Sequence, residues 1–112
     1  YRQAVKMQIT VRVRFHYLFL TSVCKLHIAF HGCLQSLDNV GLAYVQHAGY
    51  NQWAEANNIV ILYPQAAPSF IFPFNPNACW DWWGYTSPAF ATKQGLQMMT
   101  INNMVNAILG VK

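Results

Sequence analysis

The sequence predicts an α/β fold in which helices pack on a mainly parallel sheet. Residues 25–30 and 59–63 are apolar segments of strand length, and the segment between them has helical character. A strand, a helical segment and a second strand in this order form a βαβ unit, whose two strands run parallel in one sheet. The length of 112 residues suits one domain.

The N-terminal segment contains the first candidate strand. Residues 8–15 alternate strictly between polar and apolar side chains, which is the period-2 pattern of a half-buried strand. Residues 15–23 combine a basic lead with an apolar middle, but the segment is too short for a signal peptide and is interrupted by His16. We therefore treat residues 1–23 as an unassigned, leader-like segment and residues 24–112 as the domain.

The predicted βαβ unit begins with the strand at residues 25–30 (KLHIAF). This strand leads directly into His31-Gly32-Cys33, where the glycine permits a sharp turn at the strand end. The unit ends with residues 59–63 (IVILY), an apolar run that stops at Pro64 and is typical of a strand buried on both faces.

Two helices are predicted between these strands, at residues 38–47 and 51–57. Gly49 and Tyr50 separate them, and Asp38 and Asn51 are available as N-caps. The prediction of a parallel pair of strands depends on these helices, because a parallel connection needs a crossover of this length.

The C-terminal part of the domain is predicted to be a long loop followed by a helix. Residues 64–88 are rich in proline, asparagine and aromatic residues, and the aromatic content argues against disorder. The helix carries apolar residues at helical spacing and ends near Gly110; these residues are Met98, Ile101, Val105 and Ile108.

Composition limits the possible partners. Charged residues make up 9% of the chain, against about 25% in a typical soluble domain. With many aromatic rings and few charges to cover its surface, the chain is expected to be a fragment that packs against further protein. The basic residues cluster in the first 25 positions, so the body lacks the basic face of a nucleic-acid binder. The sequence contains no apolar run of about 20 residues, so no membrane-spanning helix is predicted.

The chain contains three cysteines, Cys24, Cys33 and Cys79, which cannot all pair with one another. In a secreted protein, the odd cysteine would be a free thiol, or would bond to another chain or to a further part of the same polypeptide. In a cytosolic protein, all three would be small buried apolar residues.

The turn after the second strand is the main candidate for chemistry. A loop that follows an early strand in α/β-hydrolases donates a backbone N–H to the oxyanion hole, although a plain turn with a packed imidazole also fits this tripeptide. Cys24, His27, His31 and Cys33 are zinc-ligand types, but a strand would point Cys24 away from the others, so we predict no metal site. A Cys33–His31 nucleophilic pair has little room for an orienting group.

The aromatic residues of the long loop have two interpretations. They could pack in the core, or they could line an apolar substrate crevice. Asp81 is predicted to accept hydrogen bonds within the loop rather than to act as a base. The residues concerned are Trp80, Trp82, Trp83 and Tyr85.

Three blocks of the sequence together resemble a known family. They are CKLHIAFHGCLQS (24–36), HAGYNQWAEANNIVILYPQA (47–66) and NPNACWDWWGYTSPAFATKQGLQM (75–98). In this order and spacing, they are similar to the esterases of the poly(3-hydroxybutyrate) depolymerase family. The resemblance covers residues 24 to about 109, whereas residues 1–23 do not resemble the family.

The resemblance implies an α/β-hydrolase fold and a secreted, cofactor-independent serine esterase that hydrolyses ester bonds of polyhydroxyalkanoates. It assigns the backbone N–H of Cys33 to the oxyanion hole, and the aromatic residues Trp80, Trp82, Trp83 and Tyr85 to the border of the polymer crevice. No residue of this chain matches the catalytic Ser, Asp or His of the family, and no G-x-S-x-G motif is present.

The resemblance thus leads us to expect the oxyanion-hole half of an extracellular or periplasmic esterase. Its partners would be a polyester or short-chain ester substrate and the missing portion of the same hydrolase domain. The alternative is a non-catalytic remnant, or a pseudogene product, that binds apolar ligands.

Overall fold

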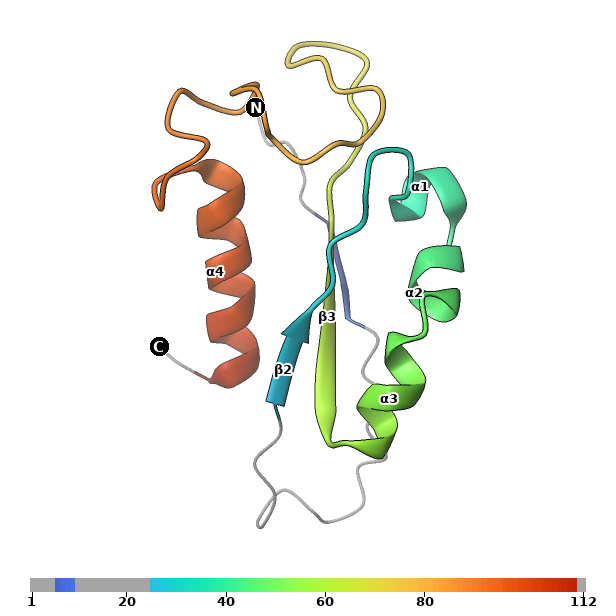
Figure 1. The fold of residues 1–112 in the computed structure, drawn as a ribbon. Coiled ribbons are helices and arrows are strands. Elements are labelled where there is room, and N and C mark those ends of the chain that lie inside the picture. The colour runs from blue at the N-terminus through green and yellow to red at the C-terminus, as the bar shows by residue number, and fades with distance from the viewer. Residues whose placement is uncertain (1–5, 10–24, 111–112) are drawn as a thin grey trace.

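The computed structural model describes residues 6–9 and 25–110, and its strands form one three-stranded sheet (Figure 1). The strands are β1 (Lys6–Ile9), β2 (Lys25–Ile28) and β3 (Ile59–Gln65), and β3 lies in the middle. β2 runs parallel to β3, whereas β1 runs antiparallel to it. The α/β class is therefore confirmed, but the described sheet is mixed rather than mainly parallel.

The register of the sheet explains how β3 passes through a proline. We predicted that this strand would stop at Pro64, but it continues to Gln65. Leu62 accepts a hydrogen bond from the N–H of Ala29 on the β2 side, and Pro64, two residues later, faces the same side. Because β2 has already ended at Ile28, the missing N–H of the proline interrupts no ladder.

The first strand agrees only in part with the prediction for residues 8–15. β1 begins two residues earlier, and its pairing with β3 places Ile9 opposite Leu62. The remainder of the predicted strand, residues 10–15, lies outside the described residues, as do residues 15–23.

Three short helices connect β2 to β3 and complete the predicted βαβ unit. They are α1 (Leu37–Val40), α2 (Ala43–His47) and α3 (Tyr50–Ala56). The single helix predicted for residues 38–47 is wrong, because the chain turns at Gly41, whose φ is +58°. A glycine adopts this left-handed conformation without the steric cost of a side chain, so the helix breaks there.

The N-caps also differ from the prediction, which named Asp38 and Asn51. Ser36 precedes α1 and Gly49 precedes α3. Asn51 instead lies inside α3, where its side-chain oxygen accepts a hydrogen bond of 2.8 Å from the hydroxyl of Tyr63. This bond links α3 to β3 and satisfies a tyrosine that is fully buried.

The hydrophobic core lies between β3 and helices α2 and α3. Its five buried members are Ala29, Val45, Ala54, Ile61 and Tyr63. The ring of Tyr44 packs edge-on against Tyr63, with 6.1 Å between the ring centroids. This face of the sheet is therefore closed by the helices of the βαβ unit.

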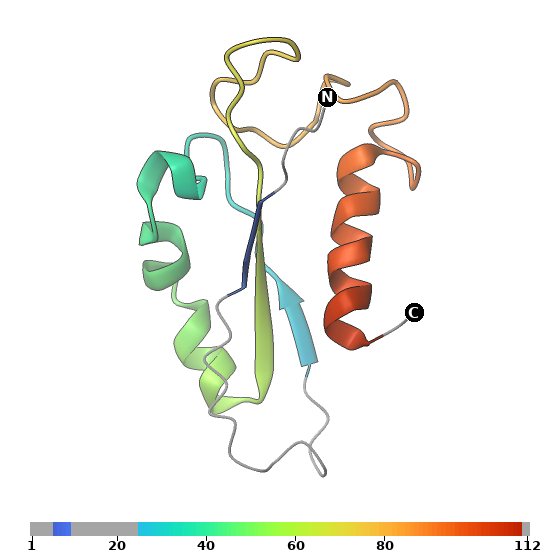
Figure 2. The same cartoon turned by 180° about the vertical axis from the view of Figure 1, so that it is seen from behind.

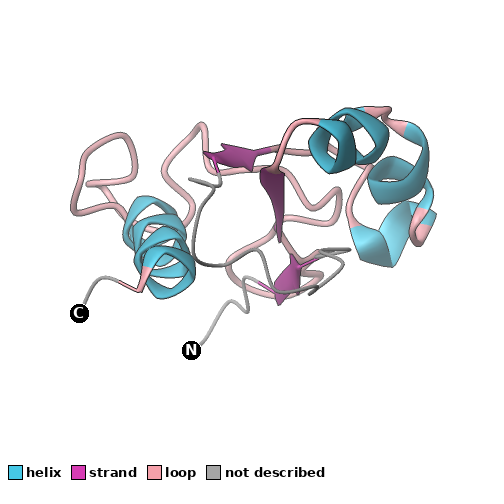
Figure 3. Cartoon of the chain, turned by 90° about the horizontal axis from the view of Figure 1, so that it is seen from below, coloured by secondary structure: helices cyan, strands magenta, loops and turns pink. Residues whose placement is uncertain are grey.

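The long helix α4 (Leu96–Leu109) lies on the opposite side of the sheet from α1, α2 and α3 (Figures 1 and 2). The view from below shows the strands between α4 and the three short helices (Figure 3). As predicted, the helix ends at Gly110, which has a φ of +68°. None of its residues is buried.

Candidate functional site

The turn after β2 is fixed by the side chain of His31, which is 2% exposed. Its Nε2 atom accepts a hydrogen bond of 3.0 Å from the N–H of Ala66, and its Nδ1 atom lies 2.7 Å from the carbonyl oxygen of Gly32. The indole N–H of Trp80 donates to the carbonyl oxygen of His31 over 3.0 Å. His31 therefore joins the carboxyl ends of β2 and β3 to the loop at residues 75–88, which we name the aromatic loop.

The backbone N–H groups of this turn are not equivalent. The N–H of Gly32 donates to Oε1 of Gln35 over 2.9 Å, and the N–H of Leu34 donates to the carbonyl oxygen of Asn77 over 2.7 Å. Between them, the N–H of Cys33 has no acceptor among the described residues. In this exposed turn, both neighbouring N–H groups are thus engaged, while that of Cys33 is not engaged by any described residue.

A disulfide bond between Cys33 and Cys79 closes the site, with the two Cα atoms 4.4 Å apart. Two of the three cysteines are therefore paired, which differs from the cytosolic alternative of three buried thiols. The bond removes the sulfur of Cys33 from thiolate chemistry, both as a nucleophile and as a zinc ligand. Among residues 6–9 and 25–110, no three His, Cys, Asp or Glu side chains are grouped to hold a metal ion. The third cysteine, Cys24, lies outside the described residues.

Asn75 anchors the aromatic loop, and sequence reasoning did not identify it. Its side chain is 1% exposed, accepts the N–H of Cys79 over 3.0 Å, and donates to the carbonyl oxygen of Cys79 over 2.9 Å. Its backbone forms two hydrogen bonds of 2.9 Å with Ser69. Its position before a proline, in a loop rich in turn residues, was the only available signal.

Asp81 organises the next part of the loop, as the sequence predicted. Its carboxylate accepts the N–H groups of Gly84 (2.6 Å), Tyr85 (3.0 Å) and Thr86 (2.8 Å), together with the Thr86 hydroxyl. Burial would raise the pKa of Asp81, but these hydrogen bonds outweigh it and hold the pKa below its ordinary value. The carboxylate is thus an acceptor that shapes the loop.

The four predicted crevice residues differ in exposure. Trp80 and Tyr85 are half-buried, whereas Trp82 is 73% exposed and Trp83 is 44% exposed. The ring centroids of Trp82 and Trp83 lie 5.2 Å apart, and those of Trp83 and Tyr85 lie 4.6 Å apart. Trp82 and Trp83 are therefore the members available to a ligand at the surface.

Gln97 at the start of α4 is a second residue that sequence reasoning missed. Its Oε1 accepts the N–H of Asp81 over 2.8 Å, and its Nε2 donates to the hydroxyl of Tyr85 over 2.8 Å. The pKa of Tyr85 is raised, mainly by burial. No local pattern marks a glutamine for such a role, because both partners come from another element.

The loop between Ser69 and Asn75 presents a second apolar surface. Four of its side chains are 64% to 86% exposed, and no charged residue lies between Tyr63 and Asp81. The backbone bonds between Ser69 and Asn75 close the base of this loop. We name the following residues the apolar loop: Phe70, Ile71, Phe72 and Phe74.

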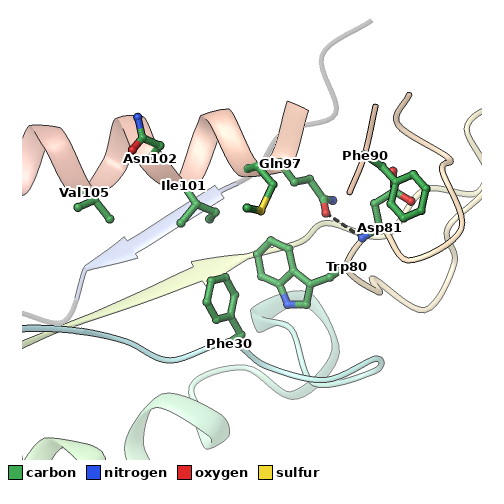
Figure 4. Close-up of a pocket in the computed structure, with 9 residues that line it drawn as sticks. Phe30, Trp80, Asp81, Phe90, Gln97, Ile101, Asn102 and Val105 are labelled. Carbon is green, nitrogen blue, oxygen red and sulfur yellow. Dashed lines mark hydrogen bonds between the residues drawn. The ribbon is translucent and has the colours of Figure 1, made fainter. Parts of the chain in front are cut away.

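A cavity of about 570 Å³ lies along the inner face of α4 (Figure 4). In this view, Ile101 and Val105 face Phe30 and Trp80 across the open space, and the bond from Asp81 to Gln97 lies at one end. Trp80 is the only one of the four predicted crevice residues that lines this described cavity.

Within the part of the chain that the structure describes, no helix has both the length and the apolar character to cross a bilayer.

Comparison with known proteins shows which proteins this chain is similar to. No family model matches the chain. It is 47% identical over 88 residues to the poly(3-hydroxybutyrate) depolymerase of Delftia acidovorans, and 43% identical over 96 residues to the polyhydroxybutyrate depolymerase of Talaromyces funiculosus. Each match covers 79% of this chain, but the chain spans only 17% and 28% of the lengths of these relatives.

Solved structures agree with the sequence matches. The crystal structure of the PHB depolymerase from Penicillium funiculosum matches with a TM-score of 0.74 and 42% identity, over 77% of this chain and 30% of that one. A serine-to-alanine PHB depolymerase complexed with an R3HB trimer matches equally well.

Fold and site together define an α/β protein in which the loop after a parallel strand is closed covalently onto an aromatic loop. The identities of 42% to 47% over more than three quarters of the chain then specify its relatives. Over that part, the chain is similar to poly(3-hydroxybutyrate) depolymerases.

Proposed function

We propose that this chain supplies the oxyanion-hole half of a secreted serine esterase that has an α/β-hydrolase fold and hydrolyses ester bonds of polyhydroxyalkanoates. The observation that carries the proposal is the N–H of Cys33, which has no acceptor among the described residues and lies between two engaged N–H groups in the turn after a parallel strand. An oxyanion hole needs a donor of this kind, held in place before the reaction begins.

In the proposed mechanism, a serine oxygen attacks the ester carbonyl carbon while its proton passes to the catalytic His, and the carbonyl oxygen becomes negatively charged. The N–H of Cys33 donates a hydrogen bond to this oxygen and so stabilises the tetrahedral intermediate. The disulfide to Cys79 and the bond from Leu34 to Asn77 restrict movement of the turn, so little reorganisation is needed as charge develops.

The catalytic Ser, Asp and His are proposed to come from the portion of the depolymerases that this chain does not span. Two observations support this. No G-x-S-x-G motif is present, and both ring nitrogens of His31 are engaged, so it has no free nitrogen to act as a base. The chain alone should therefore retain at most the acceleration of about 10³ to 10⁴ over water that binding and an oxyanion hole give without a triad.

A solid, uncharged polyester suits the exposed surfaces. The apolar loop and the exposed rings of Trp82 and Trp83 offer apolar contacts near the turn. The apolar loop itself contains no charged side chain. A related depolymerase binds an R3HB trimer. The disulfide is consistent with the oxidising compartment that secretion would provide.

A chimera tests the proposal directly. Residues 25–109 of this chain would replace the matching segment of the Talaromyces funiculosus depolymerase, and release of 3-hydroxybutyrate from polymer would be measured. We expect hydrolysis by the chimera and none that is detectable from the 112-residue chain. A folded chimera without activity would refute the proposal.

A second candidate is the binding of apolar ligands without catalysis. The cavity along α4 favours it, because a volume of about 570 Å³ lies in the range of small-molecule sites. Binding of an uncharged apolar dye to the isolated chain, abolished by Ile101→Asp and unaffected by the exposed control Asn103→Asp, would support it. An inactive, folded chimera together with this result would favour binding over catalysis.

A further inference from the structure

We propose that His31 is a positioning residue that sets the direction of the Cys33 N–H through the peptide group between Gly32 and Cys33. This inference rests on the proposed function, since it assigns a purpose to that N–H. It concerns a side chain that the proposed chemistry itself does not use.

The argument begins with the geometry of one peptide group. The carbonyl of Gly32 and the N–H of Cys33 belong to the same planar unit, and among the described residues only the Phe72–Pro73 bond is cis. In a trans peptide, the C=O and the N–H point in opposite directions. Any group that holds the Gly32 oxygen on one side therefore directs the Cys33 N–H to the other.

His31 is such a group. Its Nδ1–H donates to the Gly32 oxygen over 2.7 Å, and the N–H of Gln35 reaches the same oxygen over 3.2 Å. The first bond is short, and it comes from a ring that is nearly inaccessible to solvent. The carbonyl is thus held by a rigid donor rather than by a mobile side chain.

The second ring nitrogen fixes which tautomer His31 adopts. Ala66, just after β3, donates its N–H to Nε2 over 3.0 Å, so Nε2 must be unprotonated. In a neutral imidazole the proton is then on Nδ1, where it faces the Gly32 oxygen. The Ala66 N–H therefore selects the form of the ring that can hold the turn.

Trp80 restrains the ring from the side of the aromatic loop. Its indole N–H binds the His31 carbonyl oxygen, and its ring centroid lies 5.3 Å from that of the imidazole. His31 consequently cannot swing away without breaking contacts to two other segments. The direction of the Cys33 N–H is thereby tied to the ends of both parallel strands.

Two substitutions separate the roles of the two nitrogens. In His31→Asn, the side-chain amide lies near the position of Nδ1 and can still donate to the Gly32 oxygen, but it cannot reach Ala66. In His31→Gln, the longer side chain can reach Ala66 with its oxygen but presents no donor at the Nδ1 position. Both variants should lower the melting temperature, whereas the exposed control His47→Gln should not.

The experiment measures kcat and KM for these variants in the chimera with a soluble ester. We expect His31→Gln to lower kcat about tenfold, a fraction of the loss caused by removing a whole donor, with KM unchanged because the contact acts on the transition state. His31→Asn should stay within about threefold of the parent. Equal kcat for Gln and parent, or an equal loss in Asn and Gln, would overturn the proposal.

A readout independent of activity is the tautomer of the His31 ring. Nitrogen NMR of the chimera labelled in its imidazoles, with His31→Gln identifying the signal, should show a proton on Nδ1 and none on Nε2. A proton on Nε2 would refute the positioning role. A chimera with the expected tautomer but no hydrolysis would leave this geometry standing and refute the proposed function instead.

Discussion

Replacing Cys33 by proline and by alanine separates the backbone role of this residue from its disulfide. Both substitutions remove the bond to Cys79, which closes a loop with a sequence separation of 46 residues. The chain-entropy relation gives about 4 kcal/mol for a loop of that size, so both variants should lose a similar free energy of unfolding. Only proline also removes the N–H.

The difference between the two variants therefore isolates the donor. Losing one oxyanion-hole donor costs about 2.7 to 4 kcal/mol, which corresponds to a kcat about 10² to 10³ lower. We expect Cys33→Pro in the chimera to show this loss relative to Cys33→Ala, with similar KM, when a soluble ester is assayed well below both melting temperatures. Matching circular dichroism spectra would establish that both variants are folded. If the folded Pro and Ala variants shared one kcat, the assignment of this N–H would be wrong.

Three further predictions concern the surrounding loops. Asp81→Asn should lower the free energy of unfolding above the ordinary carboxyl pKa, and this effect should shrink as pH falls through the lowered pKa of Asp81, because the stability contributed by a lowered carboxyl pKa is lost there; urea unfolding over a pH series measures this. The oxidised chain should expose one titratable thiol after denaturation, that of Cys24, and three after reduction; three without reduction would contradict the bridge. In the chimera, Phe70→Ser with Phe72→Ser should weaken adsorption to polymer granules and leave soluble-ester hydrolysis unchanged, whereas unchanged adsorption would remove the apolar loop from substrate binding.

The sequence predicted those parts of the fold that depend on local patterns. The apolar runs in β2 and β3 and the helical segment between them specify a βαβ unit, and the glycine after Leu109 predicts the end of α4. The break at Gly41 was missed because the residues on both sides favour a helix, and a single glycine is often tolerated inside one. The antiparallel pairing of β1 was missed because strand alternation carries no information about the partner.

The residues of the site could be predicted only where the pattern that marks them lies within one short stretch of sequence. The His31-Gly32-Cys33 turn was evident from its position after a strand, and Asp81 from its surroundings in a turn-rich loop. The pairing of Cys33 with Cys79 could not be deduced, because three cysteines allow three different pairs. Gln97 could not be found because its partners, Asp81 and Tyr85, are set by the packing of α4 against a separate loop. Asn75 binds Cys79 within its own loop, where its position before a proline was the only signal.

These contacts explain why one peptide group can serve as a preorganised donor in an exposed turn. The sulfur of Cys33 is bonded to Cys79, the neighbouring N–H of Leu34 is bonded to Asn77, and the carbonyl on the other side of the peptide is held by His31. Each constraint acts on a different atom next to the Cys33 N–H, and none of them uses the N–H itself. Because the donor is held by its neighbours and has no acceptor among the described residues, a hydrogen bond to a developing oxyanion would break no bond within that part of the chain. Such a donor lowers the barrier to the extent that it binds the oxyanion more strongly than the ground-state carbonyl oxygen.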